Sequence, residues 1–170
     1  GNCLLLSAKG VELYSKFFTD LILALQAAGA PMEQIWSYQL RNEFFVEHWN
    51  PPFNKSSGLV TAANGVSYDM SNAADKIRMG EDGVVFWANA VRQAIRQVDP
   101  QALVTAGFFT PNAPNILREG DERIVPFRAA MERSELDFFD IHAYAGFHDF
   151  RLEAENYGII GYMDKPVVLG

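Results

Sequence analysis

The end of one predicted strand carries the first residues that could do chemistry. Strand parity over residues 35–43 puts Trp36, Tyr38 and Leu40 on one face, and Ser37, Gln39, Arg41 and Glu43 on the other. Glu43 would then face inward at the carboxyl end of the strand, where partial desolvation raises the pKa of a carboxyl group, as a general acid requires. The alternative is a surface glutamate in a loop, with Asn42 as a turn residue.

A second polar group ends another predicted strand, over residues 137–144. Parity places Asp140, His142 and Tyr144 on one side. Imidazole and phenol groups can donate hydrogen bonds to a carboxylate or to a hydroxyl-rich ligand. The alternative is a packed strand end with satisfied polar tips. Because His148 and Asp149 follow, a zinc or manganese site is a further and weaker hypothesis.

Residues 44–80 form a predicted connection far longer than is usual in α/β proteins, which indicates a functional loop. Trp49 in this loop could pack on a sugar ring, or it could simply hold the loop in place. Within the loop, residues 59–62 and 66–69 flank Asn64-Gly65, a strong turn signal that predicts a β-hairpin. We expect this hairpin to project over the carboxyl ends of the strands.

The elements that must position these residues alternate along the chain. Apolar residues at three- and four-residue steps predict helices over residues 11–28 and 81–98, with weaker signals over 124–133 and 150–163. Short apolar runs predict strands over residues 35–40, 102–108, 137–144 and 166–169, and residues 3–7 are the candidate for one more. This alternation predicts an α/β fold of parallel strands with helical crossovers, whose sites lie at the carboxyl ends of the strands.

Composition excludes several classes of protein. The chain has 170 residues, of which 49% are hydrophobic, and this is enough to bury a core. A net charge of −7 argues against a nucleic-acid surface, and a single cysteine excludes an internal disulfide framework and a thiolate zinc cluster. No apolar run is long enough for a membrane helix, and the first residues lack the basic start of a signal peptide. We therefore expect a soluble protein.

Four blocks of the sequence resemble a glycoside hydrolase of clan A, most closely the cellulase-like enzymes of glycoside hydrolase family 5. Residues 35–43, which end in Asn42-Glu43, resemble the fourth barrel strand with its Asn-Glu motif. Residues 84–109 resemble the next helix and the fifth strand, 136–144 the sixth strand with its His and Tyr, and 165–170 the approach to the seventh. The resemblance implies one partial (β/α)8 TIM-barrel domain over residues 1–170, truncated at both ends.

The same resemblance implies a retaining O-glycosyl hydrolase that cleaves a β-linked glucan or mannan without a metal or organic cofactor. Glu43 would be the general acid/base, and Asn42 would bind the sugar 2-hydroxyl. His142 would contact substrate and Tyr144 would orient the nucleophile, a Glu expected directly after Gly170. Family analogy is compatible with secretion. The alternatives are a non-catalytic carbohydrate-binding half-barrel and, less favoured, a metal-dependent TIM-barrel hydrolase that uses His142 and His148.

A partial barrel must leave strand edges unpaired and its inner face uncovered. Four strands cannot close a sheet that needs eight, and large exposed apolar patches are uncommon on monomers. We therefore expect the chain to form a homodimer or to belong to a longer protein. We also expect little or no glycosidase activity from residues 1–170 alone.

Overall fold

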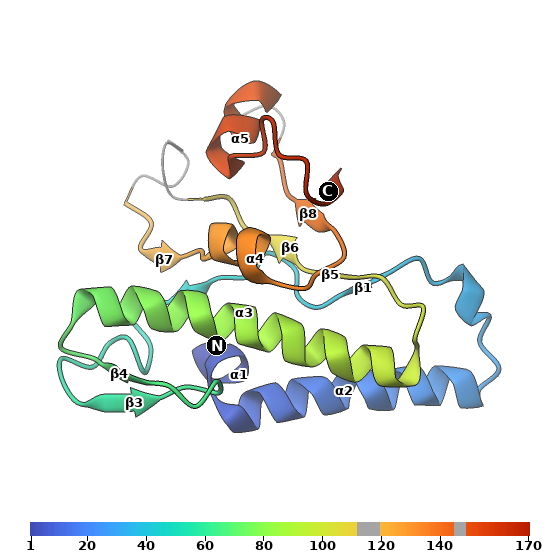
Figure 1. The fold of residues 1–170 in the computed structure, drawn as a ribbon, viewed down its shortest axis with the longest axis horizontal. Helices are drawn as coiled ribbons and strands as arrows, with labels where there is room; N and C mark the ends of the chain where they lie inside the picture. The colour runs from blue at the N-terminus through green and yellow to red at the C-terminus, as the bar shows by residue number, and fades with distance from the viewer. Residues whose placement is uncertain (112–119, 145–148) are drawn as a thin grey trace.

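The computed structural model describes residues 1–111, 120–144 and 149–170. Two long helices, α2 (Ala8–Ala27) and α3 (Ala73–Val98), lie side by side and run in the same direction along the longest axis of the molecule (Figure 1). The shorter helices are α1 (Asn2–Leu6), α4 (Phe127–Arg133) and α5 (Phe150–Tyr157), and a 3-10 turn, η1 (Met32–Gln34), follows α2.

The parallel strands are short and follow one another in chain order. They are β1 (Tyr38–Gln39), β5 (Val104–Thr105), β6 (Gly107–Phe108), β8 (Phe139–Ile141) and β9 (Val167–Leu169). β1 pairs with β5, β6 pairs with β8, and β8 pairs with β9, while a bridge between Phe44 and Phe108 links the two groups. The predicted α/β alternation with parallel strands is confirmed. In the described ranges the strands form small sheets and no closed barrel.

Two antiparallel pairs accompany the parallel strands. β2 (Val46–Glu47) pairs with β7 (Arg123–Ile124), and β3 (Leu59–Thr61) pairs with β4 (Ser67–Asp69). The second pair confirms the predicted hairpin, and Gly65 has the positive φ of 78° that its turn needs.

The hairpin is held by helices, which corrects its expected position over the strand ends. The Ala63 amide donates to the Leu6 carbonyl over 2.8 Å, and the Tyr68 hydroxyl donates to Asp82 of α3 over 3.0 Å. In Figure 1 the hairpin lies on the opposite side of α3 from α4.

The bounds of all four predicted helices need correction. α2 begins at Ala8 rather than residue 11 and ends at Ala27. α3 begins at Ala73 rather than residue 81, because the Asn72 side chain caps its polar first turn, which has no apolar periodicity to reveal it. α4 begins at Phe127, since Ile124 belongs to β7. α5 ends at Tyr157, where Gly158 adopts a left-handed φ of 65°.

The candidate strand over residues 3–7 is wrong, because α1 occupies this position. Leu5 and Leu6 are buried in the core, and the buried Asn2 side chain bonds to the chain near Glu47. A short apolar run does not distinguish a strand from a helical turn, and here tertiary packing decides.

An aromatic core lies between α3 and the parallel strands. The Phe44 ring lies 5.1 Å from Phe108 and 6.1 Å from Trp87 of α3, and Phe108 lies 5.4 Å from Phe139. All four rings are fully buried. The aromatic side chains on one face of the strands pack toward α3. The polar side chains that alternate with these aromatic residues therefore project from the other face.

Strand parity holds for part of the first strand only. Tyr38 and Leu40 are buried as predicted, but Trp36 is 63% exposed, with its ring 5.0 Å from Phe138. The reason is that β1 begins at Tyr38, so the alternation does not extend back to Trp36.

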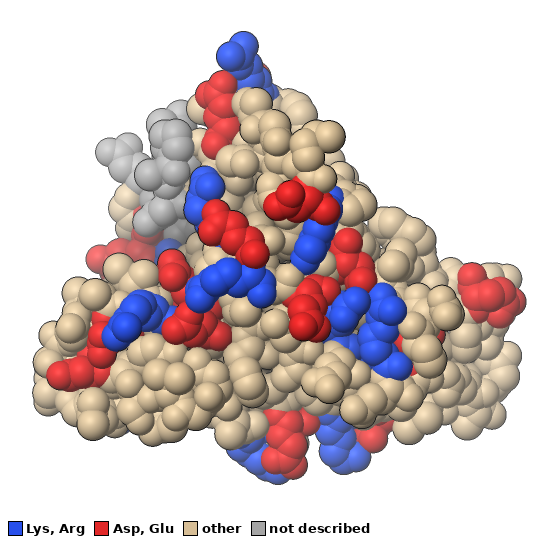
Figure 2. All heavy atoms as spheres, in the orientation of Figure 1, with Lys and Arg blue, Asp and Glu red and all other residues tan. Residues whose placement is uncertain are grey.

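The helical face of the molecule carries charges of both signs. Figure 2 shows acidic and basic side chains next to one another over α3 and α4. Arg133 of α4 is 2.7 Å from Asp82 of α3, and Arg92 of α3 is 2.7 Å from Asp137. Among the described residues, none of the helices combines the length and apolar character needed to cross a membrane.

Candidate functional site

Glu43 lies just beyond the carboxyl end of β1 with an unusual backbone conformation. Its φ is 44°, in the left-handed region that residues other than glycine rarely adopt. The flanking backbone is clamped to β6, since the Phe44 amide donates to the Gly107 carbonyl over 3.0 Å and the Gly107 amide donates to the Arg41 carbonyl over 2.8 Å. Such strain persists only where the surrounding structure holds it, and it is most frequent at functional sites.

The Glu43 side chain meets His142, which follows β8. Glu43 Oε1 is 3.0 Å from His142 Nδ1, and the two side chains are only 20% and 15% exposed. β6 pairs with β8 and is bridged to Phe44 through Phe108, and the contact joins residues 99 positions apart in sequence. The predicted acid and the predicted substrate-binding histidine are therefore brought together.

Tyr157 of α5 fixes the backbone beside His142. Its hydroxyl lies 3.1 Å from the His142 carbonyl oxygen and 3.0 Å from that of Phe108. Burial raises the pKa of Tyr157, with the nearby carboxylates of Glu153 and Glu43 adding to the effect. The phenol therefore stays protonated and remains a hydrogen-bond donor.

The polar contacts continue from His142 to two further side chains. His142 Nε2 lies 3.6 Å from Asp140 Oδ2, and Gln39 Nε2 donates to the same oxygen over 2.8 Å. Asp140 Oδ1 is buried without a hydrogen-bond partner among the described residues. We call Gln39, Asp140, His142 and Glu43 the polar row.

Two glycines leave the space that the polar row occupies. A Cβ on Gly107 would lie 2.4 Å from Gln39 Nε2 and 2.9 Å from His142 Nε2. A Cβ on Gly170 would lie 2.5 Å from Asp140 Oδ1. No side chain other than hydrogen fits at either position without moving the row.

A cationic and aromatic cluster lies near Glu43. The Arg123 guanidinium lies 4.0 Å from the ring centroid of Phe109 and 4.9 Å from that of Phe45. Asp121 hydrogen-bonds to Arg123 and raises its pKa, and the charge of Glu43 adds to this effect. Arg123 therefore places a permanent positive charge within electrostatic reach of the candidate acid.

The other predicted substrate residues, as the structure describes them, do not bond to Glu43 or His142. Asn42 is exposed, Tyr144 is 44% exposed, and Trp49 is 47% exposed. Trp49 packs edge-on against His48, whose Nε2 lies 3.0 Å from Glu122 Oε2 beside β7. In the part of the chain that the structure describes, no hydrogen bond joins Asn42, Trp49 or Tyr144 to Glu43 or His142.

The described residues give little support to the hypothesis of a zinc or manganese site. Within residues 1–111, 120–144 and 149–170, no three His, Cys, Asp or Glu side chains are grouped to hold a metal ion. Asp149 instead caps α5, where it accepts a hydrogen bond from the Leu152 amide over 2.8 Å. His148 lies outside the described residues.

Sequence reasoning did not single out Gln39, Gly107 and Gly170, which lie at the candidate site. No motif marks them, and only the parallel register brings them next to Asp140 and His142. Parity did place Gln39 on the face of Glu43, and Asp140 on the face of His142. The signal available was therefore the shared face, and the missing information was which strands are neighbours.

The polar row can hold a proton and move it between a carboxyl group and an imidazole, as general acid/base chemistry requires.

Comparisons of the chain with protein-family models, with curated proteins and with solved structures found no match. The resemblance to clan A therefore depends on the four sequence blocks alone.

Proposed function

We propose that residues 1–170 carry the acid/base part of a retaining β-glycosidase that acts on a β-linked oligosaccharide or polysaccharide. The observation that supports this most strongly is the 3.0 Å contact between Glu43 Oε1 and His142 Nδ1 at the carboxyl ends of parallel strands. That end of the strands is where α/β enzymes place their sites. The left-handed φ of Glu43 adds support, because strain of this kind gathers at active sites.

The arrangement of strands favours a section of a (β/α)8 barrel over other α/β folds. A helix separates the two strands of each parallel pair along the chain: α3 lies between β1 and β5, α4 between β6 and β8, and α5 between β8 and β9. Barrels order their strands in this way, whereas doubly wound sheets reverse direction at a switch point.

In the proposed reaction Glu43 first protonates the leaving oxygen and later takes a proton from water. Double displacement needs a second carboxyl group roughly 5–5.5 Å away as the nucleophile. The resemblance puts this group directly after Gly170, whose amide donates to the Ile141 carbonyl over 2.8 Å, beside β8 and His142. Asn42, Tyr144 and Trp49 are the proposed substrate contacts around this centre.

The test is a Glu43→Gln substitution in a chain extended past Gly170. We expect hydrolysis of unactivated β-glycosides to fall by about 10²–10⁴-fold, because proton transfer to the leaving group is lost. Aryl β-glycosides with good leaving groups should still form the glycosyl intermediate. Glu33→Gln, at an exposed site in η1, is the matched control and should keep full activity. Unchanged hydrolysis of unactivated substrate by Glu43→Gln would contradict the proposal.

A second candidate function is sugar binding without cleavage, favoured by the half-exposed ring of Trp49. Titration of residues 1–170 with cello- and manno-oligosaccharides, followed by tryptophan fluorescence, addresses this candidate. Trp49→Ala should abolish the fluorescence change, and Trp36→Ala should preserve it. Saturable binding by an extended chain that lacks turnover would favour this function over catalysis.

We also propose that the chain self-associates, because apolar side chains on α1 and α2 face solvent. Leu4 is 42%, Leu13 47%, Phe17 60% and Leu21 39% exposed. Leu13, Phe17 and Leu21 recur at four-residue steps and so form one stripe along α2. An exposed stripe of this kind is typical of a face that another polypeptide covers.

A further inference from the structure

Both ring nitrogens of His142 face carboxyl groups, and this restricts where its protons can be. Nδ1 lies 3.0 Å from Glu43 Oε1, and Nε2 lies 3.6 Å from Asp140 Oδ2. Which nitrogen carries the proton in a neutral histidine depends on the partner of the other nitrogen.

We propose that Asp140 is a positioning residue that keeps a proton on Nε2 of His142, so that Nδ1 and Glu43 share a single further proton. The general acid is then the Glu43–His142 pair rather than Glu43 alone. The catalytic meaning of this arrangement rests on the proposed glycosidase function, whereas the placement of the protons does not.

The carboxylate of Asp140 is fixed from several sides. Gln39 donates to its Oδ2 over 2.8 Å, and its Oδ1 is buried within 2.5 Å of the point where a Cβ on Gly170 would lie. An ionised carboxylate only accepts hydrogen bonds. A lone pair on His142 Nε2 would therefore face the acceptor oxygen Oδ2 of Asp140, whereas an Nε2–H group is attracted to it.

With Nε2 protonated, two arrangements remain for the contact with Glu43. Either a neutral Glu43 carboxyl donates to Nδ1, or an imidazolium Nδ1–H donates to the Glu43 carboxylate. They differ only in the position of one proton along the 3.0 Å contact.

The proton balance follows directly. When the leaving group departs, the Glu43 O–H bond breaks and the proton goes to the glycosidic oxygen. The Glu43 carboxylate then faces the lone pair of His142 Nδ1, so two hydrogen-bond acceptors lie at close range. The repulsion between these acceptors favours the return of a proton to the pair. In the second step a water O–H bond breaks, its oxygen attacks the anomeric carbon, and its proton restores the pair.

Two further groups lie near this pair. The Arg123 guanidinium places a positive charge within electrostatic reach of Glu43. The Tyr157 hydroxyl contacts the His142 carbonyl and fixes the backbone rather than the ring.

The direct test is NMR of the imidazole nitrogens in nitrogen-labelled residues 1–170, with the His142 signal assigned by its loss in His142→Gln. We expect neutral His142 to carry its proton on Nε2, with a protonated Glu43 carboxyl donating to Nδ1. In Asp140→Ala this acceptor is lost, so the proton should move to Nδ1 and be donated to the Glu43 carboxylate. Asp164→Ala, which removes an exposed carboxylate elsewhere, is the matched control and should leave the wild-type pattern unchanged.

The wild-type spectrum alone can overturn the proposal, even if Asp140→Ala does not fold. A proton on Nδ1 of neutral wild-type His142, or an unchanged tautomer in folded Asp140→Ala, contradicts it. Turnover of the extended chain is a separate measurement. There Asp140→Ala should reduce kcat by about 10- to 100-fold for unactivated substrates and less for activated ones. An Nε2 proton without glycosidase activity would leave the proton placement standing and contradict the proposed function.

Discussion

At the scale of single residues, Glu43 and Gly107 depend on each other. The Gly107 amide and carbonyl clamp the backbone around Glu43, and the missing side chain leaves room for Gln39 and His142. A glycine is thus needed here for close approach, not for a special φ. The candidate site is therefore sensitive to substitutions that add volume between its strands.

Gly107→Ala tests this dependence. The added Cβ would lie 2.4 Å from Gln39 Nε2, so we expect displacement of Gln39 and His142 and a loss of about 1–3 kcal/mol in unfolding free energy. Denaturant unfolding and the His142 imidazole NMR signal measure the two effects. Gly80→Ala is the control, since its Cβ would make only ordinary contacts, from 3.6 Å, inside α3. Equal stabilities of the two variants would contradict the expectation.

Asn2 shows how one buried polar side chain positions a loop. Its Nδ2 donates to the Glu47 carbonyl over 2.7 Å and to the Pro51 carbonyl over 3.1 Å, and its Oδ1 accepts from the Glu47 amide over 2.7 Å. These bonds tie α1 to β2 and so support the chain that follows Glu43.

Asn2→Ala would leave buried backbone groups near Glu47 unsatisfied. We expect a loss of about 1–3 kcal/mol in unfolding free energy. Asn54→Ala, at an exposed position in the same loop, should change it by less than about 0.5 kcal/mol. Urea unfolding of both variants measures the difference. A similar unfolding free energy for the two variants would show that the hydrogen bonds of Asn2 do not stabilise the fold.

At the scale of elements, Asp137 joins the start of β8 to α3 and β5. Its carboxylate accepts hydrogen bonds from Arg92 over 2.7 Å, from Arg96 over 2.9 Å and from the Val104 amide over 2.9 Å. Burial alone would raise the pKa of Asp137, but the hydrogen bonds and the charges of Arg92 and Arg96 outweigh it and lower the pKa. The contacts lie at the end of the strands away from Glu43, so their role is structural.

A carboxyl group whose folded pKa is lowered stabilises the fold above its unfolded pKa of about 3.9 and loses this effect as the pH falls through the folded value. We expect Asp137→Asn to reduce unfolding free energy near neutral pH by about 1–3 kcal/mol. The difference from wild type should shrink as the pH falls below about 4. Urea unfolding across this range measures it. Asp164→Asn serves as the exposed control, and a difference independent of pH would contradict the assignment.

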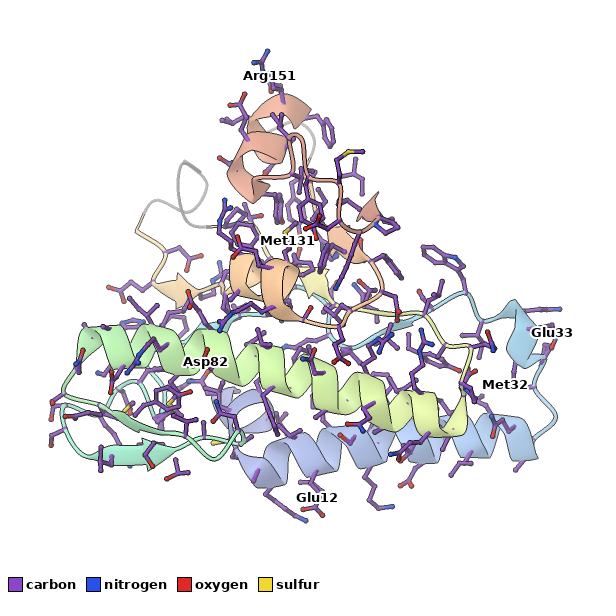
Figure 3. All side chains as sticks on the ribbon, in the orientation of Figure 1. Glu12, Met32, Glu33, Asp82, Met131 and Arg151 are labelled. Atoms are coloured by element: carbon purple, nitrogen blue, oxygen red, sulfur yellow. The ribbon has the colours of Figure 1, made fainter. Side chains whose placement is uncertain are left out.

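At the scale of the whole molecule, the exposed stripe on α2 sets the expected association state. The side of α2 that faces away from α3 is not covered by any described element, and Glu12 points to this side in Figure 3. Lys16 and Asp20 form an ion pair over 2.7 Å along the same helix. We expect wild-type protein to show a concentration-dependent mass above that of a monomer in light scattering.

Phe17→Lys should shift this equilibrium toward the monomer, because it places a charge at the centre of the stripe. Leu59→Lys, at a 75% exposed position on the hairpin, should not. A wild-type mass that stays monomeric over a broad concentration range would contradict the self-association proposal.

The sequence by itself determined the alternation of helices and strands, the two long helices and the hairpin. Each depends on local information: an apolar stripe at helical spacing in α2 and α3, and Asn64-Gly65 for the turn. Parity also placed Glu43 on the inward face at one strand end, and His142 on the same side as Asp140 at another. These are properties of a short stretch of chain, so they can be read without knowing what packs against it.

Only the tertiary structure decided which inward-facing groups meet. The 3.0 Å contact of Glu43 with His142 requires β6 to pair with β8 and to bridge to Phe44. The place of Gln39 beside Asp140 requires the register of β1 with β5 and of β6 with β8. The candidate strand over residues 3–7 illustrates the same limit. A short strand or a helical turn could each have buried Leu5 and Leu6, and only packing against the core decided for the helix. Register and packing are set by contacts between residues far apart in sequence, and no local pattern specifies them.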